Sequence, residues 1–399
     1  MFWSAKRMAQ QIPGINPELL VWARKRAGQT VAEVAAAMRK PVDVIESWEL
    51  GETAPTYIQL ETLAYKVFKR PVALFFFPTP PEEVDAEHEF RTLPGAEIEE
   101  LDADTRLKVR EAQALQIQLD ELTAGKNPST RLILRDVAVS VASAVESAAV
   151  VRDYLGVPLS TQTEVWTNVD DAFKAWRTAV EEVGIFVFKD TFKQRDISGF
   201  SLYAAEFPLI LINNSTALAR QIFTLFHEVA HLLVHESGVT KKNDSYIARL
   251  SGDARRIEVF CNAFAAEFLV PSGQIDAVLR SSGVSDAAVS ELAARYKVSR
   301  AVILRRMLDL GFVTQARYEA RVKQWDDEYD AAQKARKEKG AGGNYYHTIG
   351  TYLSDRYTRL AFSQYYRGHI SADQLAGYLN VSVKNVPTFE EYMLRKAVG

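Results

Sequence analysis

Apolar residues recur at helical spacing along most of the 399-residue chain, and in the first part they predict five short helices. The first four are expected near residues 17–27, 30–38, 42–50 and 55–67, and a short fifth helix rich in phenylalanine starts at Pro71. Thr30 and Glu33 form a capping box, and Gly51 is a favourable residue directly after a helix. Residues 1–78 are therefore expected to form a small helical domain.

Beyond this domain the pattern changes twice. Residues 79–100 contain three prolines among acidic residues and read as a linker. Three helices are then expected at about 102–122, 137–155 and 170–183, followed by short β-prone runs at 184–189, 197–203 and 209–213. The chain is therefore expected to be α+β and mostly helical, with one small sheet in a domain that spans residues 101–312.

The last part of the chain is helical again. Helices are predicted at 287–296 and 300–310, and a charged helical linker occupies residues 313–343. That linker ends in the glycine-rich run 340–343, which is expected to be a flexible joint. Residues 344–399 are predicted to form a helical module rich in tyrosine that packs on the preceding domain.

Candidate chemistry lies on the helix predicted from Gln221 to Val234. His227 and His231 are four residues apart, so both imidazoles leave one face of this helix and can bind one metal ion. Glu228 lies beside them, where it can take a proton from water. This His-Glu-x-x-His arrangement indicates a metal-dependent hydrolase.

A site of this kind requires a third protein ligand, and the next predicted helix offers two glutamates. Glu258 and Glu267 are nine positions apart, which is about 180° on a helix, so only one of them can face the metal. Asn262 lies one turn from Glu258 and is a candidate to support a histidine ligand. Arg220 is expected to form a structural ion pair.

Composition excludes several classes of protein. The formal net charge is −3, which gives no general attraction to nucleic acid or membrane. A single cysteine rules out an intramolecular disulfide and favours a reducing compartment, so we expect a cytoplasmic protein. The sequence shows neither a signal peptide nor an apolar run long enough to cross a membrane.

Three blocks of sequence, in this order, resemble the ImmA/IrrE metallopeptidases: Leu211-Ile212-Asn213, then Arg220-Gln221-x-Phe223-Thr224-x-x-His227-Glu228-x-Ala230-His231-Leu232, then Glu258-x-x-x-Asn262-x-Phe264-Ala265-x-x-x-Leu269-x-Pro271. The resemblance implies a minimal zincin-like fold with Glu258 as the third ligand and Glu228 as the general base. It implies Zn²⁺ as the cofactor, with Mn²⁺ or another divalent ion as alternatives.

A peptidase of this type requires a strand that holds its substrate. Strands 197–203 and 209–213 precede the motif helix, and either is a candidate to pair with an extended peptide if it lies at the sheet edge. Gly199 would permit close approach of another backbone, and Asn213 ends the second strand. Both residues are therefore candidates for substrate binding.

The N-terminal domain resembles the lambda-repressor-like (Xre-type) helix-turn-helix family, to which members of the peptidase family are often fused. The resemblance rests on Gln29-Thr30-Val31-Ala32-Glu33-Val34-Ala35, then Val44-Ile45-Glu46-Ser47-Trp48-Glu49-x-Gly51-Glu52-x-x-Pro55-Thr56, then Leu60-x-x-Leu63-Ala64. It implies DNA contacts from Gln29, Arg39 and Lys40. The expected recognition helix, however, carries three acidic residues, which repel phosphates. Docking to a protein is therefore the alternative.

Together these features predict a zinc endopeptidase that cleaves a regulatory protein, such as a transcriptional repressor, in a stress response or in the control of a mobile element or toxin–antitoxin system. The alternative is a DNA-binding regulator or antitoxin-like protein. In that case residues 17–78 bind DNA, and the peptidase domain acts in cis or as a sensor.

Overall fold

The computed structural model describes residues 12–81, 101–194, 196–241, 244–282, 284–338 and 345–398. Most of the predicted linker 79–100 and the glycine run 340–343 lie outside these residues. The chain divides into two compact units, Met1–Gln113 with Phe192–Arg195, and Ala114–Thr191 with Asp196–Gly399. Each unit is described separately below.

The N-terminal unit contains the helices that the sequence predicts. They are α2 (Pro17–Arg26), α3 (Val31–Met38), α4 (Val42–Glu49) and α5 (Tyr57–Glu61), which continues as the π-helix η1 (Thr62–Phe68), and the 3₁₀ helix η2 (Val72–Phe76). Thr30 caps α3 in a complete capping box with Glu33. The helices enclose a small core that includes Leu19, Val34 and Phe75.

The second unit is built on a four-stranded sheet of β1 (Phe186–Asp190), β2 (Ile197–Leu202), β3 (Leu209–Asn213) and β4 (Gly238–Lys241), in the order β1-β3-β2-β4. β1 pairs parallel to β3, and the other neighbours are antiparallel. The first three strands confirm the predicted β runs, whereas β4 was not predicted. The fold is therefore mostly helical with one small sheet.

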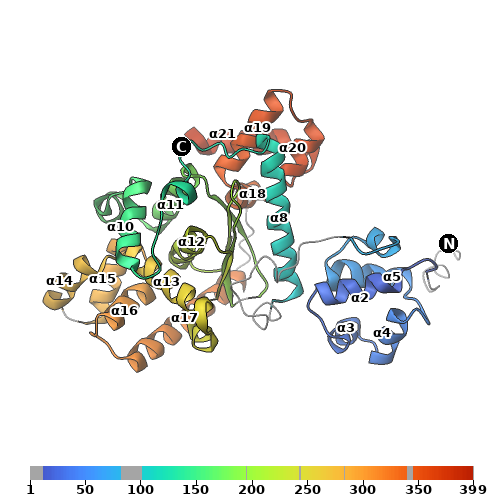
Figure 1. Cartoon of the computed structure of the whole chain (residues 1–399), viewed down its shortest axis with the longest axis horizontal. Coiled ribbons are helices and arrows are strands. Elements are labelled where there is room, and N and C mark those ends of the chain that lie inside the picture. Colours follow the sequence, from blue (N-terminus) through green and yellow to red (C-terminus); the bar gives the residue numbers. More distant parts are fainter. Residues whose placement is uncertain are drawn as a thin grey trace. The chain divides into compact units, whose positions relative to one another are not determined.

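Helices cover both faces of this sheet. α11 (Val169–Glu182) and α12 (Leu218–Leu233) pack on one face, and α18 (Tyr345–Leu353) and α19 (Asp355–Tyr366) lie on the other side (Figure 1). Successive residues of β1 contact opposite helical layers. Phe188 packs edge-on against Tyr357 of α19, and Lys189 lies over Phe173 of α11. Burial on both faces explains why these strands read as continuous apolar runs.

The main core lies between α12 and α13 (Gly252–Leu269). Phe226 of α12 stacks on Phe268 of α13 with ring centroids 4.0 Å apart, and Trp176 of α11 packs edge-on against both rings. Burying aromatic side chains of this size provides a large part of the hydrophobic stabilisation of a domain. The two helices are thereby held in a fixed register.

The C-terminal module, residues 344–399, packs on the rest of the second unit, as predicted. Its contact with the sheet runs through Arg177 of α11, whose guanidinium donates to the carbonyls of Thr351 (2.7 Å) and Tyr352 (3.2 Å) and to Val187 of β1 (3.0 Å). Tyr357 also donates to Gln118 at 2.7 Å. These partly buried bonds tie the module to β1 at the edge of the sheet and to the helix that carries Gln118.

One predicted helix is wrong at its start. The sequence pattern placed it at 137–155, but the structure has a single turn, α9 (Ile133–Asp136), and then α10 (Ala144–Leu155). Val137 has an extended backbone, and Ser143 caps α10 by accepting a bond from the Glu146 amide. A local side-chain cap therefore overrides the helical spacing of the preceding residues.

The remaining elements complete the second unit, apart from α8, which begins in the first. They are α8 (Ala103–Thr123), η3 (Thr161–Val165), η4 (Asp244–Arg249), α14 (Ser272–Ser282), α15 (Asp286–Tyr296), α16 (Arg300–Asp309), α17 (Gln315–Glu338), α20 (Ala372–Tyr378), η5 (Val383–Asn385) and α21 (Val386–Val398). Within the described part of the chain, none of the helices has the length and hydropathy required to cross a bilayer.

A buried lysine in β1 makes stability depend on pH. Burial, with a smaller contribution from Arg177, lowers the pKa of Lys189 from 10.5 to about 7. Between these values the unfolded chain binds a proton that the folded chain does not, so stability falls as the pH falls through this window. Lys189→Met should therefore be more stable than the wild type at neutral pH, by about 4 kcal/mol at about 1.4 kcal/mol for each unit of the lowered pKa, and the difference should shrink towards pH 10.5.

Urea unfolding at a series of pH values measures this difference. Lys323→Met, at an exposed position of α17, is the matched control and should not alter the pH dependence. An equal pH dependence of stability in wild type and Lys189→Met would contradict the prediction.

Candidate metal centre

Two histidines lie on one buried face of α12. The Nε2 atoms of His227 and His231 are 3.1 Å apart, and both side chains are 0% exposed. Their four-residue spacing on a helix produces this arrangement, since such residues lie one above the other. Two ring nitrogens are thus directed at one point.

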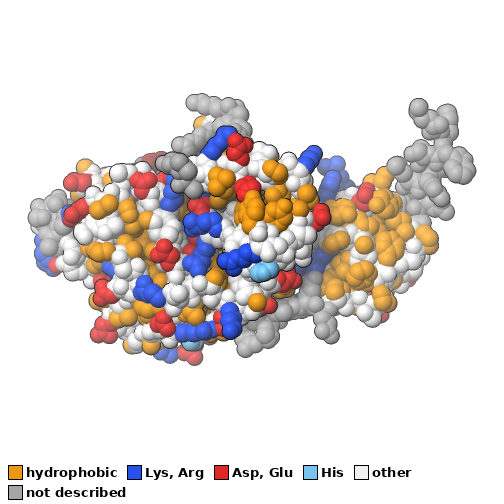
Figure 2. All heavy atoms as spheres, turned by 90° about the horizontal axis from the view of Figure 1, so that it is seen from above, with side chains coloured by type: hydrophobic (Ala, Val, Ile, Leu, Met, Phe, Trp, Pro, Cys, Tyr) orange, Lys and Arg blue, Asp and Glu red, His pale blue; other side chains and the backbone are white. Residues whose placement is uncertain are grey.

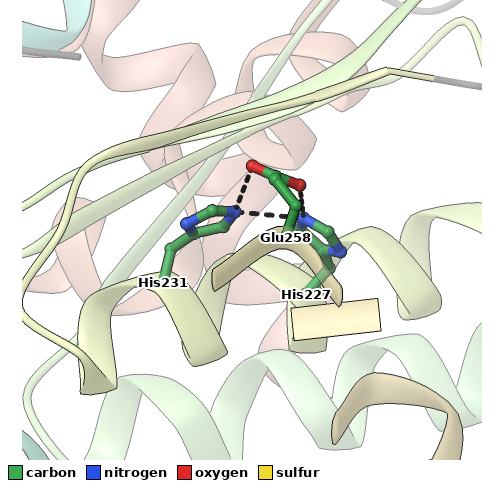
Figure 3. A group of neighbouring side chains, drawn as sticks. All are labelled: His227, His231 and Glu258. Carbon is green, nitrogen blue, oxygen red and sulfur yellow. Dashed lines mark hydrogen bonds and ion pairs between the residues drawn. The ribbon is translucent and has the colours of Figure 1, made fainter. Parts of the chain in front are cut away.

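Glu258 of α13 reaches the same point. Its Oε1 lies 3.2 Å from Nε2 of His231 and its Oε2 lies 3.4 Å from Nε2 of His227 (Figure 3). One donor atom from each of the three side chains lies within 4.8 Å of the others. Glu267 faces elsewhere and forms a buried ion pair with Arg306. Of the two glutamates left open by helical spacing, the structure brings Glu258 to the histidines.

The ionisable side chains of this group change one another's pKa values. Burial would raise the pKa of Glu258, but the charge of His231 and the interaction with His227 hold it well below its usual range. Burial opposes protonation of His231, while Cys261 and Glu258 raise its pKa well above the ordinary value. The carboxylate is therefore charged at neutral pH.

The donor set fits a divalent transition metal. Two imidazoles and one carboxylate are the three protein ligands of a common type of catalytic zinc site. Oε1 of Glu258 is buried and makes no hydrogen bond, although it lies at the centre of the group. A buried charged oxygen without a hydrogen bond is costly, and a cation at this position would compensate for it.

Glu228 is fixed beside the group by two hydroxyls from different strands. Ser201 of β2 donates to its Oε2 at 2.7 Å, and Thr240 of β4 donates to its Oε1. The side chain is fully buried, and burial raises its pKa against the opposing charges of His231 and His227. The carboxylate therefore has a fixed orientation and a raised proton affinity, both of which suit proton transfer.

The two predicted support residues occupy different places. Asn262 lies with Oδ1 3.0 Å from Nδ1 of His227, where it can accept the ring proton and orient the imidazole. Arg220 forms an ion pair with Asp326 of α17 at 3.3 Å, two turns before His227 on α12. Asn262 thus contacts a ligand, and Arg220 joins α12 to α17.

The expected substrate strands are not at the sheet edge, and that prediction is wrong. Gly199 lies on β2 and Asn213 on β3, and both strands are paired on both sides. A Cβ at Gly199 would lie 2.8 Å from the Leu211 carbonyl and 2.9 Å from Thr224 of α12, so this glycine allows close packing inside the fold. Asn213 donates to the Ile197 carbonyl at 2.7 Å, which is a structural bond.

The predicted DNA-contact residues all lie in the N-terminal unit. Arg39 and Lys40 are exposed at the end of α3, and Gln29 is half-buried before it. On α4, Glu49 is paired with Arg24 at 2.6 Å, so the exposed acidic residues of this helix are Asp43 and Glu46. Figure 2 also shows apolar side chains gathered on the visible face of this unit, and among the described residues Leu50 is 71% exposed.

The sequence reasoning missed four residues around the site: Ser201, Gly238, Thr240 and Tyr246. The last three follow α12, and Gly238 and Thr240 belong to β4, which has only four residues. The available signal for this strand was the short β-prone run that follows Gly238. This run can be assigned to the site only once its pairing with β2, beside α12, is known.

Gly238 packs directly against a metal-binding imidazole. A Cβ at this position would lie 2.5 Å from Cγ and Cδ2 of His231. Gly238→Ala should therefore displace the ring and weaken Zn²⁺ binding by about 10-fold or more, because a displaced ligand loses its geometry. Competition with a chromophoric chelator measures the affinity.

Gly273→Ala is the control, since a Cβ there meets nothing within 4 Å. Its affinity for Zn²⁺ should equal that of the wild type. Wild-type affinity in Gly238→Ala would show that the His231 ring is not constrained by β4.

The comparisons with known proteins agree with this geometry. The model of the IrrE N-terminal-like domain of the Peptidase_M78 family matches residues 180–308, which include β1, α12 and α13. Radiation response metalloprotease IrrE of Deinococcus deserti is 39% identical over 101 residues, which cover 24% of this chain and 34% of that protein. The protein of the same name from Deinococcus radiodurans is 36% identical over 96 residues, 24% of this chain and 29% of its own.

These matches support a metallopeptidase domain of this family, and such a domain implies a divalent metal. The matched segment spans about a third of the length of these relatives.

Proposed function

We propose that this chain is a zinc-dependent endopeptidase that cleaves a regulatory protein in the cytoplasm, such as a transcriptional repressor, and thereby controls gene expression. The observation that carries the proposal is the buried group of His227, His231 and Glu258 with Glu228 at its side. Two ligands one helical turn apart, a carboxylate from a second helix and an adjacent general base are the parts that peptide hydrolysis requires.

His227, His231 and Glu258 would hold the metal. When bound, a zinc ion supplies a Lewis acid that polarises the scissile carbonyl and lowers the pKa of water towards about 7. Asn262 supports this set, since its Oδ1 is 3.0 Å from Nδ1 of His227 and favours the tautomer with a free Nε2.

Glu228 acts as general base and then as general acid. It takes the proton of the attacking water and passes it to the leaving amine. Its hydrogen bonds with Ser201 and Thr240 hold both carboxylate oxygens, so the side chain keeps one orientation throughout. This pre-organisation removes the need to reorient the base during the reaction.

The regulatory role of the substrate draws on two further observations. The relatives carry the name radiation response metalloprotease, which connects those proteins with a response to radiation. This chain has an N-terminal helical unit with exposed apolar and acidic side chains. Such a surface suits recognition of another protein, and we propose that it selects the substrate.

Glu228→Gln tests the catalytic part of this proposal. The variant should bind Zn²⁺ like the wild type and cleave its substrate about 10²- to 10⁴-fold more slowly, because it lacks only the proton acceptor. Proteomes of cells with wild-type or Glu228→Gln protein should differ in one or a few intact regulatory proteins, which are then incubated with the purified enzyme.

Asp253→Asn, an exposed substitution in the first turn of α13, is the control and should leave cleavage unchanged. A Glu228→Gln protein with wild-type activity, or a wild-type protein that binds no Zn²⁺, would refute the proposal.

A DNA-binding regulator is the second candidate, and the exposed Arg39 and Lys40 favour it. Against it, Asp43 and Glu46 are exposed on α4, the helix expected to read bases. We therefore expect no sequence-specific complex with the DNA upstream of the chain's own gene at physiological salt. A gel-shift titration from low to high salt measures this.

Arg39→Ala/Lys40→Ala is the matched variant for that experiment. A specific complex formed by the wild type and lost in this double variant would support the second candidate. Equal weak retention of unrelated DNA by both proteins would count against it.

A further inference from the structure

A tyrosine outside the predicted site contacts the third ligand. Tyr246 lies on the 3₁₀ helix η4 between β4 and α13, and its side chain is 3% exposed. Its hydroxyl donates to Oε2 of Glu258 at 2.6 Å. A hydrogen bond from a hydroxyl to a carboxylate at this distance is charge-assisted and strong.

This bond makes the two oxygens of Glu258 unequal. Oε2 accepts the bond from Tyr246, whereas Oε1 makes no hydrogen bond and lies 3.2 Å from Nε2 of His231. A carboxylate that binds a metal through one oxygen leaves the other for a hydrogen-bond donor. The environment of Glu258 corresponds to this division, with Oε1 as the metal-facing atom.

Tyr246 is itself held in place. The ammonium of Lys241, at the end of β4, lies 5.4 Å from the centroid of its ring. Residues of β4 also contact the other parts of the site, since Gly238 packs on His231 and Thr240 donates to Glu228. The hydroxyl is therefore positioned by the strand that borders the metal-binding group.

We propose that Tyr246 is a positioning residue that fixes Glu258 as a one-oxygen metal ligand. The inference rests on the proposed zinc function, and it assigns to η4 a role in metal affinity. It predicts that loss of one hydroxyl, outside the ligand set, weakens metal binding through Glu258 alone.

The test measures the affinity for Zn²⁺ itself, with no peptide substrate. Tyr246→Phe removes the hydroxyl and keeps the ring, and it should bind Zn²⁺ about 10- to 100-fold more weakly in competition with a chromophoric chelator. Tyr296→Phe removes the hydroxyl of another tyrosine, which is 2% exposed and lies on α15. This control should retain wild-type affinity.

A double-variant comparison separates positioning from general structural damage. In a Glu258→Gln background, Tyr246→Phe should cause little further loss of affinity, because the ligand through which it acts has changed. Thermal unfolding of the metal-free proteins should give a midpoint lower by only about a few degrees in Tyr246→Phe, because the variant loses one hydrogen bond and keeps the ring.

Wild-type affinity in Tyr246→Phe would overturn the inference. So would an equal loss in the Glu258→Gln background, or a metal-free protein that unfolds at a much lower temperature. Failure of the wild type to bind Zn²⁺ is a different result, since it would refute the proposed function as well.

Discussion

The contact between α12 and α13 is the constraint on which the site depends. Phe226 stacks on Phe268 across this contact, and the same two helices carry His227, His231 and Glu258. A slip of one helix by a single turn, about 5.4 Å, would separate the carboxylate from the imidazoles. Apolar packing therefore sets the geometry of a polar centre.

Such a centre has a cost, because four ionisable side chains lie in the interior. Desolvation disfavours their charged forms unless each is paired or hydrogen-bonded. The partners come from separate elements: Ser201 from β2, Thr240 from β4, Tyr246 from η4 and Asn262 from α13. The sheet and the short helix η4 thus serve to satisfy and orient the groups that the two long helices bring together.

The sequence predicted the helices and strands where the signal is local. The capping box at Thr30 and the apolar run at Leu209–Asn213 each identify one element without knowledge of any other. The errors arose where contacts with distant segments of the chain decide the structure. One of the strands β2 and β3 was expected at an edge, but both lie inside the sheet, and the order of strands follows from pairing between distant segments. Likewise, β4 is too short to be recognised apart from its pairing with β2.

The sequence by itself determined that His227 and His231 share a helix face and that Glu258 and Glu267 cannot both join them, because helical periodicity is a local property. Only the tertiary structure brought Glu258 to the histidines and paired Glu267 with Arg306. It also supplied Ser201, Thr240 and Tyr246, which no spacing connects with the motif. Their roles depend on long-range packing, since contacts between separate elements are decided by how the whole core is filled.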